Sequence, residues 1–347
     1  MKYLSRLTSK EISGKICLLR VDLNLKSLDD GFRVDAIIPT IKFLLSKKAK
    51  IVIFSHRGRP KSKDGELSLK PIAKMLSVKL KKKLEFIPEF NFAKIKNKIS
   101  SDEKNGIFML ENLRFLPGEE QNSTELAKKL AYLGDFYVND AFAVCHRKNA
   151  STTAITKYIK SYAGLLLEKE LVGLANATKT PKKPLVVILG GTKIADKIGV
   201  IKNLNPKTHF FIFGSSILNE CGNLKMPEIY KNKKCLLPID SVETEGRFFD
   251  IGPQTISFYK QILSPAKTII WNGPVGMAED PRYSKGTREI AAAVTESKAI
   301  TVVGGGETAN FILKNKLEKK ISLLSTGGGA LLDFLAGKKL PGIEALK

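Results

Sequence analysis

The sequence predicts an α/β protein with two doubly wound, Rossmann-like parallel-sheet domains joined by a helix, and three observations lead to this prediction. Short apolar runs rich in β-branched residues alternate with stretches of helical periodicity along the chain, which is typical of parallel strands covered by helices on both faces. The chain has 347 residues, which at roughly 150 residues per domain indicates two domains. The residues that follow the predicted strands are mostly charged in one half and mostly glycine in the other.

The predicted elements follow from these runs in order. Strands are predicted at 16–22, 51–56, 107–112, 135–140, 185–191, 209–214, 268–273, 299–306 and 321–329. Helices are predicted at 36–48, 69–82, 123–133, 254–263 and 287–297. We therefore expect an N-terminal domain at 1–157, a connecting helix at 158–178, a C-terminal domain at 179–332, and a tail at 333–347.

The chain is strongly basic. Lys and Arg number 58 against 34 Asp and Glu, so the net charge is +24. Such an excess is typical of proteins that bind a nucleic acid, a membrane surface or small anionic substrates. However, 48 of the cations are Lys, the usual solvated surface cation, and only 10 are Arg, the better planar partner for anions. The positions of the few Arg therefore carry more information than the total charge.

The chain lacks the features of membrane and secreted proteins. No run of 18 apolar residues occurs, and the first fifteen residues contain no apolar signal core. Four Cys, at positions 17, 145, 221 and 235, show no paired spacing, so we expect buried thiols rather than disulfides or a zinc site. We therefore expect a cytoplasmic protein without a membrane partner.

Six of the ten Arg lie within or beside four motifs in the N-terminal half. These motifs are RVDLN (20–24) with Arg33, SHRGRP (55–60), ENLRF (111–115) and NDAFAVCHRKNAS (139–151). Taken singly, such residues are also typical of turns, caps and solvated loops. Ligands of open α/β sheets bind outside the carboxyl ends of strands, and several Arg meeting there would repel one another unless phosphate and carboxylate groups neutralised them. The N-terminal half therefore predicts an anion site formed by side chains.

The C-terminal half predicts a phosphate site formed by the backbone. GGTKIADK (190–197) follows a strand, and its glycines allow the backbone to approach a phosphate closely. A helix that starts here would place Lys193 and Lys197 on one face, although such lysines are also ordinary on helix surfaces. In WNGPVGMAED (271–280), Glu279 is either a ligand of ribose hydroxyls or a surface acid.

Two triple glycines, 304–306 and 327–329, each follow a predicted strand and precede a predicted helix. The first fits the GxGxxA fingerprint of dinucleotide-binding proteins, so a dinucleotide-dependent dehydrogenase is one candidate. The acidic residue expected near the end of the next strand is missing, because that strand ends in Ser325 and Thr326. Two neighbouring helix N-termini suit a triphosphate or a transferred phosphoryl group better, and no Walker-type P-loop sequence is present.

Taken together and in order, these motifs resemble those of the phosphoglycerate kinase family. The resemblance runs from RVDLN to the C-terminal LPGIEAL and includes LGGTKIADK, DIGP, WNGPVG, GGGET and STGGGA. It implies reversible phosphoryl transfer from 1,3-bisphosphoglycerate to ADP, which gives 3-phosphoglycerate and ATP, with Mg²⁺ as cofactor, and it implies that the tail at 333–347 packs back onto the N-terminal domain. Because groups from both domains would hold the transferred phosphoryl group, we expect the domains of a monomer to close around the connecting helix. Two other classes remain open, namely an impaired homologue that binds nucleic acid through its lysines and the dehydrogenase.

The resemblance also implies a set of site residues. The glycerate would be bound by Asp22, Asn24, Arg33, His56, Arg59, Arg114, His146 and Arg147. The nucleotide would be bound by Gly191, Lys193, Lys197, Gly214, Asn272, Glu279, Gly305, Gly306, Glu307, Thr308, Gly327, Gly328 and Gly329. Arg33, Lys193 and Gly328 would act on the transferring phosphoryl group, and Glu307 would face the Mg²⁺.

Several positions depart from the family pattern. Glu307 stands where the family has Asp, and Ser215 stands where a second glycine is usual. Phe248 and Phe249 precede DIGP, where the family tends to have Gly-Leu, and the chain before DIGP is shorter than usual. Arg57 replaces an uncharged residue and is left out of the expected site. These changes surround the expected adenine pocket, so the resemblance leaves the nucleotide preference open.

Overall fold

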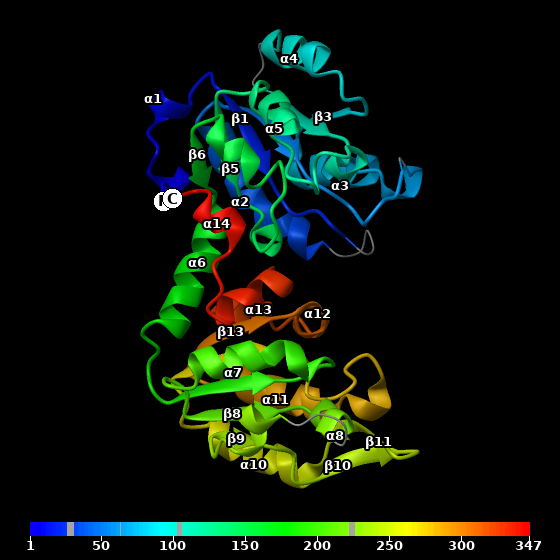
Figure 1. Ribbon diagram of the computed structural model, residues 1–347, viewed down its shortest axis with the longest axis vertical. Coiled ribbons are helices and arrows are strands. Elements are labelled where there is room, and N and C mark those ends of the chain that lie inside the picture. The colour runs from blue at the N-terminus through cyan, green and yellow to red at the C-terminus, as the bar shows by residue number, and fades with distance from the viewer. Residues whose placement is uncertain (26–30, 63, 103–105, 222–225) are drawn as a thin grey trace. The chain divides into compact units, whose positions relative to one another are not determined.

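The computed structural model describes residues 1–25, 31–62, 64–102, 106–221 and 226–347, and it divides into two compact units (Figure 1). The first unit contains Met1–Lys169 together with Lys339–Lys347, and the second contains Glu170–Lys338. Each unit contains one six-stranded parallel sheet. The predicted α/β class with two doubly wound sheets is therefore confirmed.

The sheet of the first unit has the strand order β3-β4-β2-β1-β5-β6. Its strands are β1 (Ile16–Arg20), β2 (Lys50–Phe54), β3 (Leu84–Ile87), β4 (Ile107–Leu110), β5 (Phe136–Asn139) and β6 (Ser161–Ala163). All neighbours pair in parallel. Because β4, β2, β1 and β5 are consecutive in the sheet, the residues that follow these four strands lie along one edge.

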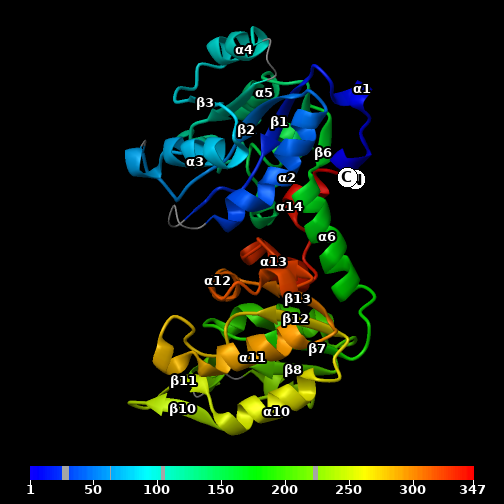
Figure 2. The same cartoon turned by 180° about the vertical axis from the view of Figure 1, so that it is seen from behind.

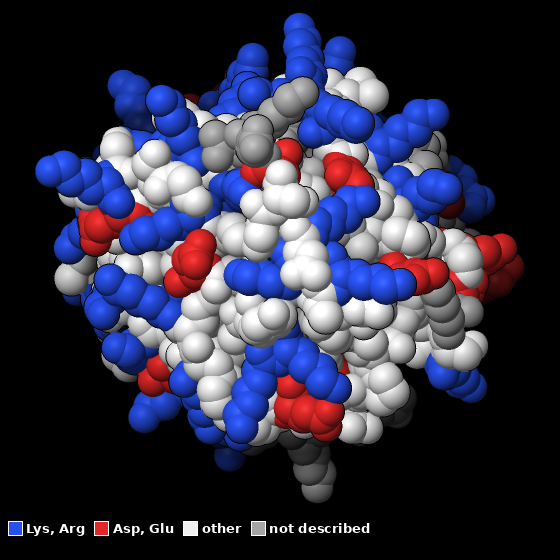
Figure 3. All heavy atoms as spheres, turned by 90° about the horizontal axis from the view of Figure 1, so that it is seen from above, with Lys and Arg blue, Asp and Glu red and all other residues white. Residues whose placement is uncertain are grey.

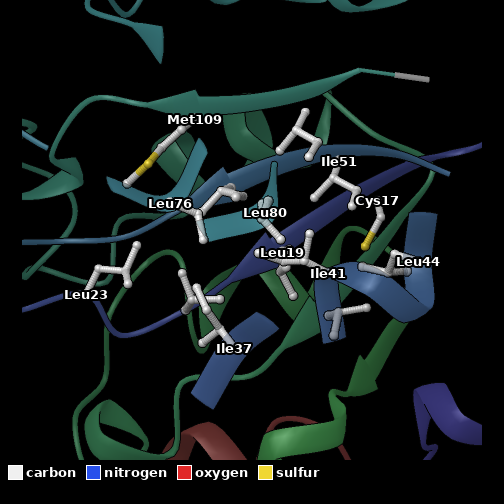
Figure 4. Packing of buried hydrophobic residues seen from close by; sticks show 14 of the residues in the cluster. Cys17, Leu19, Leu23, Ile37, Ile41, Leu44, Ile51, Leu76, Leu80 and Met109 are labelled. Carbon is white, nitrogen blue, oxygen red and sulfur yellow. The ribbon is translucent and has the colours of Figure 1, made fainter. Parts of the chain in front are cut away.

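Helices cover both faces of this sheet. They are α1 (Ser9–Ile12), α2 (Phe32–Ser46), α3 (Lys70–Leu80), α4 (Phe92–Ser100), α5 (Thr124–Ala131) and α14 (Pro341–Glu344). Helices α2 and α3 face the viewer in Figure 2, whereas α5 lies on the side seen in Figure 1. Leu19 and Ile51 of the sheet pack with Ile37, Ile41 and Leu76 in one buried cluster (Figure 4). This apolar packing holds the polar strand ends in fixed positions.

The sheet of the second unit has the strand order β14-β13-β12-β7-β8-β9. Its strands are β7 (Leu185–Leu189), β8 (Phe210–Phe213), β9 (Cys235–Leu236), β12 (Thr268–Asn272), β13 (Ile300–Gly304) and β14 (Leu323–Leu324), and β10 (Ser241–Thr244) forms a hairpin with β11 (Arg247–Ile251). Its helices include α7 (Ile198–Leu204), α8 (Ser216–Cys221), α9 (Pro227–Tyr230), α10 (Pro253–Leu263), α11 (Lys285–Glu296), α12 (Gly306–Lys314) and α13 (Gly329–Leu335). The single Trp, Trp271, is fully buried in the core of this unit.

Helix α6 (Leu165–Thr178) spans the division between the units and is shorter than the helix predicted at 158–178. The residues before it form β6, which pairs with β5. The carboxylate of Asp140 accepts the backbone N–H of Leu167 at 2.9 Å, which caps the helix start. The chain end belongs to the first unit, where the N–H of Gly342 donates to the carbonyl of Cys145 at 2.8 Å.

Candidate active site

The edge of the first sheet brings the four N-terminal motifs together. Asp22 and Asn24 follow β1, His56 follows β2, Arg114 follows β4, and the His146–Arg147 pair follows β5. These strands are neighbours in the sheet, so residues that are far apart in the sequence meet at one place. We refer to this group, with Arg33 and Arg59, as the anion edge.

Asp22 orients Arg33 at the anion edge. The buried carboxylate of Asp22 forms an ion pair with the guanidinium of Arg33 through one oxygen, and its other oxygen accepts the N–H of Asn24 at 3.0 Å. The side-chain oxygen of Asn24 in turn accepts the N–H of Gly58 at 2.8 Å. The Arg33 side chain remains 25% exposed. The ion pair with Asp22 therefore orients the Arg33 side chain, and part of this side chain remains accessible to a ligand.

The remaining cations of the anion edge differ in burial. Arg114 is buried and donates to the carbonyl of Gly58, and burial lowers the pKa of its guanidinium. Arg147 is half-buried and donates to the imidazole of His146 at 3.1 Å. Arg59 is exposed and forms no hydrogen bond or ion pair with the described residues. Asp22 pairs with Arg33, and Glu120 pairs with Arg114 at 3.2 Å. These two carboxylates offset only part of the charge of the four arginines, so the edge favours an anion.

Arg57, unlike the neighbouring Arg59, hydrogen-bonds to the backbone of the loop that follows it. Its guanidinium donates to the carbonyls of Glu66 and Ser68, at 2.8 and 3.3 Å. Its own backbone N–H donates to the side chain of Asn112 at 3.2 Å. Arg57 therefore fastens the following loop to the anion edge.

His56 is buried at the centre of the anion edge. Burial lowers the pKa of its imidazole well below the usual value, and the positive charges of Arg20, Arg114, Arg33 and Arg147 lower this pKa further. The ring is therefore neutral over the physiological pH range.

The second unit contains a cleft of about 330 Å³. It is lined by Gly191, Thr192, Ser215, Ser216, Asn219, Arg247, Phe248, Phe249, Pro274, Val275, Gly276, Met277, Glu279 and Glu307. Gly191, Glu279 and Glu307 are residues that the sequence predicts for nucleotide binding. Gly214 is not among the lining residues. It packs so closely that a Cβ atom there would lie 2.8 Å from the backbone of Val275. The Gly214 position thus permits the close approach of two loops that shape the cleft.

The glycine-rich loop after β7 lies at one end of this cleft, and its lysines are arranged differently from the prediction. Lys193 has a left-handed backbone conformation (φ 64°) before the 3-10 turn Ile194–Lys197, so the two lysines do not share one face of a helix. The carboxylate of Glu220 accepts the N–H groups of Lys193 and Ile194, at 2.9 and 3.0 Å, which stabilises this loop form. Lys193 is consequently exposed, whereas Lys197 is buried.

The ammonium group of Lys197 folds back on the same loop. It donates to the carbonyls of Gly191 and Thr192, at 3.3 and 3.1 Å. Burial lowers the pKa of Lys197 to about 8, and the charges of Glu220, Asp196 and Glu307 offset part of this shift. A buried ammonium beside a glycine-rich loop is suited to bind an anionic ligand. The negative charge of such a ligand would raise the pKa of Lys197 again.

The two triple glycines meet at one edge of the second sheet. Strands β13 and β14 pair in parallel, so α12 and α13 begin side by side, as the sequence predicts. Gly305 and Gly328 have positive φ values of 97° and 47°, which Gly adopts without strain. The side-chain nitrogen of Asn272 next to Gly305 is buried and has no acceptor among the described residues. This donor is available to a phosphate oxygen.

Other predicted groups of this edge are already engaged. The buried hydroxyl of Thr308 accepts the N–H of Gly273 at 3.0 Å. The N–H of Gly327 donates to Ser325 at 3.0 Å. Gly306 and Gly329 are exposed at the starts of α12 and α13. The open donors at this edge therefore belong to Asn272 and the helix starts.

Several supporting residues were not predicted as parts of the site. The buried carboxylate of Glu119 accepts the N–H and hydroxyl of Ser151, at 3.0 and 2.5 Å, beneath the anion edge. Glu170 accepts the N–H and hydroxyl of Thr326, at 2.6 and 2.9 Å, directly before the second triple glycine. Glu220 supports the loop after β7. Nothing in the sequence alone separates these carboxylates, which accept backbone N–H groups, from solvated ones.

One parallel α/β unit carries an arginine-rich anion edge, and the other unit has a glycine-lined cleft beside two helix starts. Together these two sites define a nucleotide-dependent phosphotransferase. A family model described as "Phosphoglycerate kinase" matches residues 7–231 and 222–338 of the chain. Because this match and the relatives below cover nearly all of the chain, the chain belongs to the phosphoglycerate kinase family.

The relatives agree in sequence and in structure. The phosphoglycerate kinase of Dictyoglomus turgidum is 40% identical over 98% of each chain, and that of Thermosipho africanus is 40% identical over 99% of this chain and 98% of its own. The solved phosphoglycerate kinase of Coxiella burnetii matches with a TM-score of 0.83 at 34% identity, over 99% of this chain and 98% of its own. That of Pyrococcus horikoshii matches with a TM-score of 0.88 at 29% identity, over 100% and 98%.

Proposed function

We propose that the anion edge binds the phosphoglycerate and that the cleft of the second unit binds the nucleotide of the phosphoglycerate kinase reaction. The observation that carries this proposal is the convergence of Arg33, Arg114 and Arg147 on one sheet edge, where Asp22 and Glu120 offset only part of their charge. A ligand with a phosphate at one end and a carboxylate or acyl phosphate at the other supplies the missing negative charge.

In the proposed reaction an oxygen of the ADP β-phosphate attacks the phosphorus of the acyl phosphate. The bond from this phosphorus to the acyl oxygen breaks, and the carboxylate of 3-phosphoglycerate leaves as ATP forms. No group of the protein needs to become covalently attached, so catalysis consists of positioning and charge stabilisation. Asp22 and Asn24 would orient the acyl end, while His56, Arg59, Arg114 and Arg147 would bind the 3-phosphate.

The transferring phosphoryl group would be stabilised from both ligand sites. Arg33 would contact it at the anion edge, and Lys193 with the backbone N–H groups around Gly328 would contact it on the nucleotide side. Lys197 and the buried amide of Asn272 would bind the nucleotide phosphates. Closure of the two units around the connecting helix, which would exclude water during transfer, stays a prediction.

Glu307 offers a fitting ligand for Mg²⁺. Its carboxylate is exposed at the cleft close to Gly191, and Mg²⁺ usually combines one or two protein carboxylates with phosphate oxygens and water. In the described residues no cluster of three or more His, Cys, Asp or Glu is placed to hold a metal by itself. Glu307 would thus hold the ion together with the nucleotide, where Mg²⁺ supplies neutralising charge to the phosphates.

The part of the cleft for the base is mainly apolar. Phe248, Phe249, Val275 and Met277 line it. The amide of Asn219 is held by the backbone of Phe248, since it donates to the carbonyl of Phe248 at 2.7 Å and accepts its N–H at 2.9 Å. A base would therefore be held mainly by contact area, and we expect GDP to be used within about tenfold of ADP.

We place this activity in a cytoplasmic monomer with small-molecule substrates. Among the described residues no helix combines the length and apolarity needed to span a bilayer. On the face shown in Figure 3, Lys and Arg side chains are scattered with Asp and Glu among them. The lysine excess is thus spread out on this face, and we assign it no partner.

A coupled assay of ATP formation from 1,3-bisphosphoglycerate tests the proposed function. We expect turnover that requires Mg²⁺ and ADP, with GDP accepted as a poorer or equal substrate. Absence of turnover together with salt-dependent RNA or DNA binding would favour the nucleic-acid alternative. Binding of NAD(H) without ATP formation would favour the dehydrogenase.

A further inference from the structure

His56 lies in a buried chain of polar contacts that continues below the anion edge. Its Nδ1 is 3.2 Å from Nη2 of Arg20. Arg20 also donates to the hydroxyl of Ser151 at 2.8 Å and to the carbonyl of Val21. The carboxylate of Glu119 lies 3.8 Å from the guanidinium. Arg20 and His56 are each only 2% exposed, so these contacts are fixed by the core around them.

The contact between Arg20 and His56 determines where the proton of the imidazole lies. A guanidinium has only N–H donors and no acceptor. The Nδ1 atom that faces it must therefore accept, which requires Nδ1 to be unprotonated. A neutral imidazole then carries its proton on Nε2. This Nε2 atom lies 4.0 Å from an oxygen of Asp22, beyond hydrogen-bond distance, so its N–H remains available at the anion edge.

The charges around His56 also favour the neutral ring. Four guanidinium groups, those of Arg20, Arg33, Arg114 and Arg147, act against a second positive charge on His56, and burial acts in the same direction. The opposing acids are already occupied, because Asp22 pairs with Arg33 and Glu119 accepts from Ser151.

We propose that Arg20 is a positioning residue that fixes His56 as the neutral Nε2–H tautomer and thereby aims an uncharged donor at the bound anion. The identity of that anion rests on the proposed function, whereas the tautomer does not. Because the ring keeps one protonation state, the donor keeps the same strength while the pH changes around neutrality. The site thus gains a directed hydrogen bond without a further buried charge.

The same reasoning assigns the other two His and provides internal controls. The guanidinium of Arg147 donates to Nε2 of His146 at 3.1 Å, so His146 carries its proton on Nδ1 when neutral. The backbone N–H of Leu185 donates to Nδ1 of His209 at 3.3 Å, so the neutral form of His209 carries its proton on Nε2. Neighbouring arginines thus impose opposite tautomers on His56 and His146 in one protein.

Imidazole ¹⁵N chemical shifts of the ligand-free protein test the proposal directly. The chain contains three His, so His56→Gln and His146→Gln variants assign every signal. We expect an unprotonated Nδ1 and a protonated Nε2 for His56, unchanged between pH 5.5 and 8, and the reverse pattern in the neutral form of His146. A protonated Nδ1 in His56, or an imidazolium at pH 6, would overturn the proposal whether or not the protein turns over phosphoglycerate.

A double variant, Arg20→Met with Glu119→Gln, supplies the kinetic arm without leaving a buried charge unpaired. In this variant Nδ1 of His56 loses the donor that holds it unprotonated, whereas burial and three guanidinium groups still favour a neutral ring. The ¹⁵N signals of His56 should therefore show both neutral tautomers. Because part of the rings then lack the Nε2–H donor, the KM for 3-phosphoglycerate should rise by roughly twofold to fivefold, the effect of weakening one hydrogen bond.

The KM for the nucleotide should stay at the wild-type value. A single Nε2–H tautomer of His56 in the folded variant would show that Arg20 does not fix the tautomer. If the variant does not fold, the ¹⁵N pattern of the wild-type protein decides the question alone.

Discussion

Replacing Arg33 with Ala should lower kcat by about 10²- to 10³-fold while leaving the affinity for nucleotide unchanged. This is the loss typical of removing one directed donor that stabilises charge in a transition state. Arg33 is paired with Asp22 and partly exposed. Its guanidinium is therefore oriented by the protein and can still donate hydrogen bonds to a ligand. Steady-state kinetics and calorimetric titration with ADP measure the two quantities separately.

Two further variants sharpen this prediction. Arg33→Lys should restore only part of the activity, because one ammonium cannot form the paired hydrogen bonds of a guanidinium. Arg6→Ala removes an exposed arginine that stacks on Tyr3 and lies outside the site, and it should behave like the wild type. Wild-type turnover in Arg33→Ala would show that Arg33 does not contact the transferring group.

Replacing Lys197 with Met should weaken ADP binding by roughly 10- to 100-fold, which is the range for a lost hydrogen bond to a charged group. The wild-type protein should also show a specific pH dependence. The pKa of Lys197 is lowered to about 8, so the ammonium is charged below this pH and becomes neutral above it. Affinity for ADP should therefore fall as the pH rises through 8, and binding near pH 8 should take up a proton.

Calorimetry in buffers of different ionisation enthalpy detects that proton uptake. Lys197→Arg provides the control, because a guanidinium stays charged throughout this range and the pH dependence should disappear if the variant binds ADP. An ADP affinity in Lys197→Met equal to the wild type would contradict the assignment of Lys197 to the nucleotide phosphates.

The fold could be predicted because its central strands are continuous apolar runs. All nine predicted strands are present, from β1 to β14. The strands that were not predicted are short or carry exposed residues. β6 has three residues inside a stretch of helical periodicity, and β10 is largely exposed, so its polar sequence resembles a loop. For such elements, pairing with a neighbour outweighs local sequence preference.

The site could be predicted in part for a similar reason. The anion edge could be predicted from the few Arg that follow strands. The strand order of the sheet brings these residues together, and their meeting does not depend on the conformation of the loops. The loop after β7 could not be predicted in detail, since its form depends on Glu220 from a distant helix. The same holds for Arg20, whose burial against Glu119 and Ser151 arises only on folding.

The most direct test of this account is rapid-quench analysis with ATP labelled in its γ-phosphate, 3-phosphoglycerate and the wild-type protein. If two bound ligands exchange the phosphoryl group directly, the label should pass from ATP to 1,3-bisphosphoglycerate in one phase. No labelled protein should form, and no inorganic phosphate should be released in that phase. Labelled protein appearing before labelled 1,3-bisphosphoglycerate would contradict the account, because it would require a protein nucleophile.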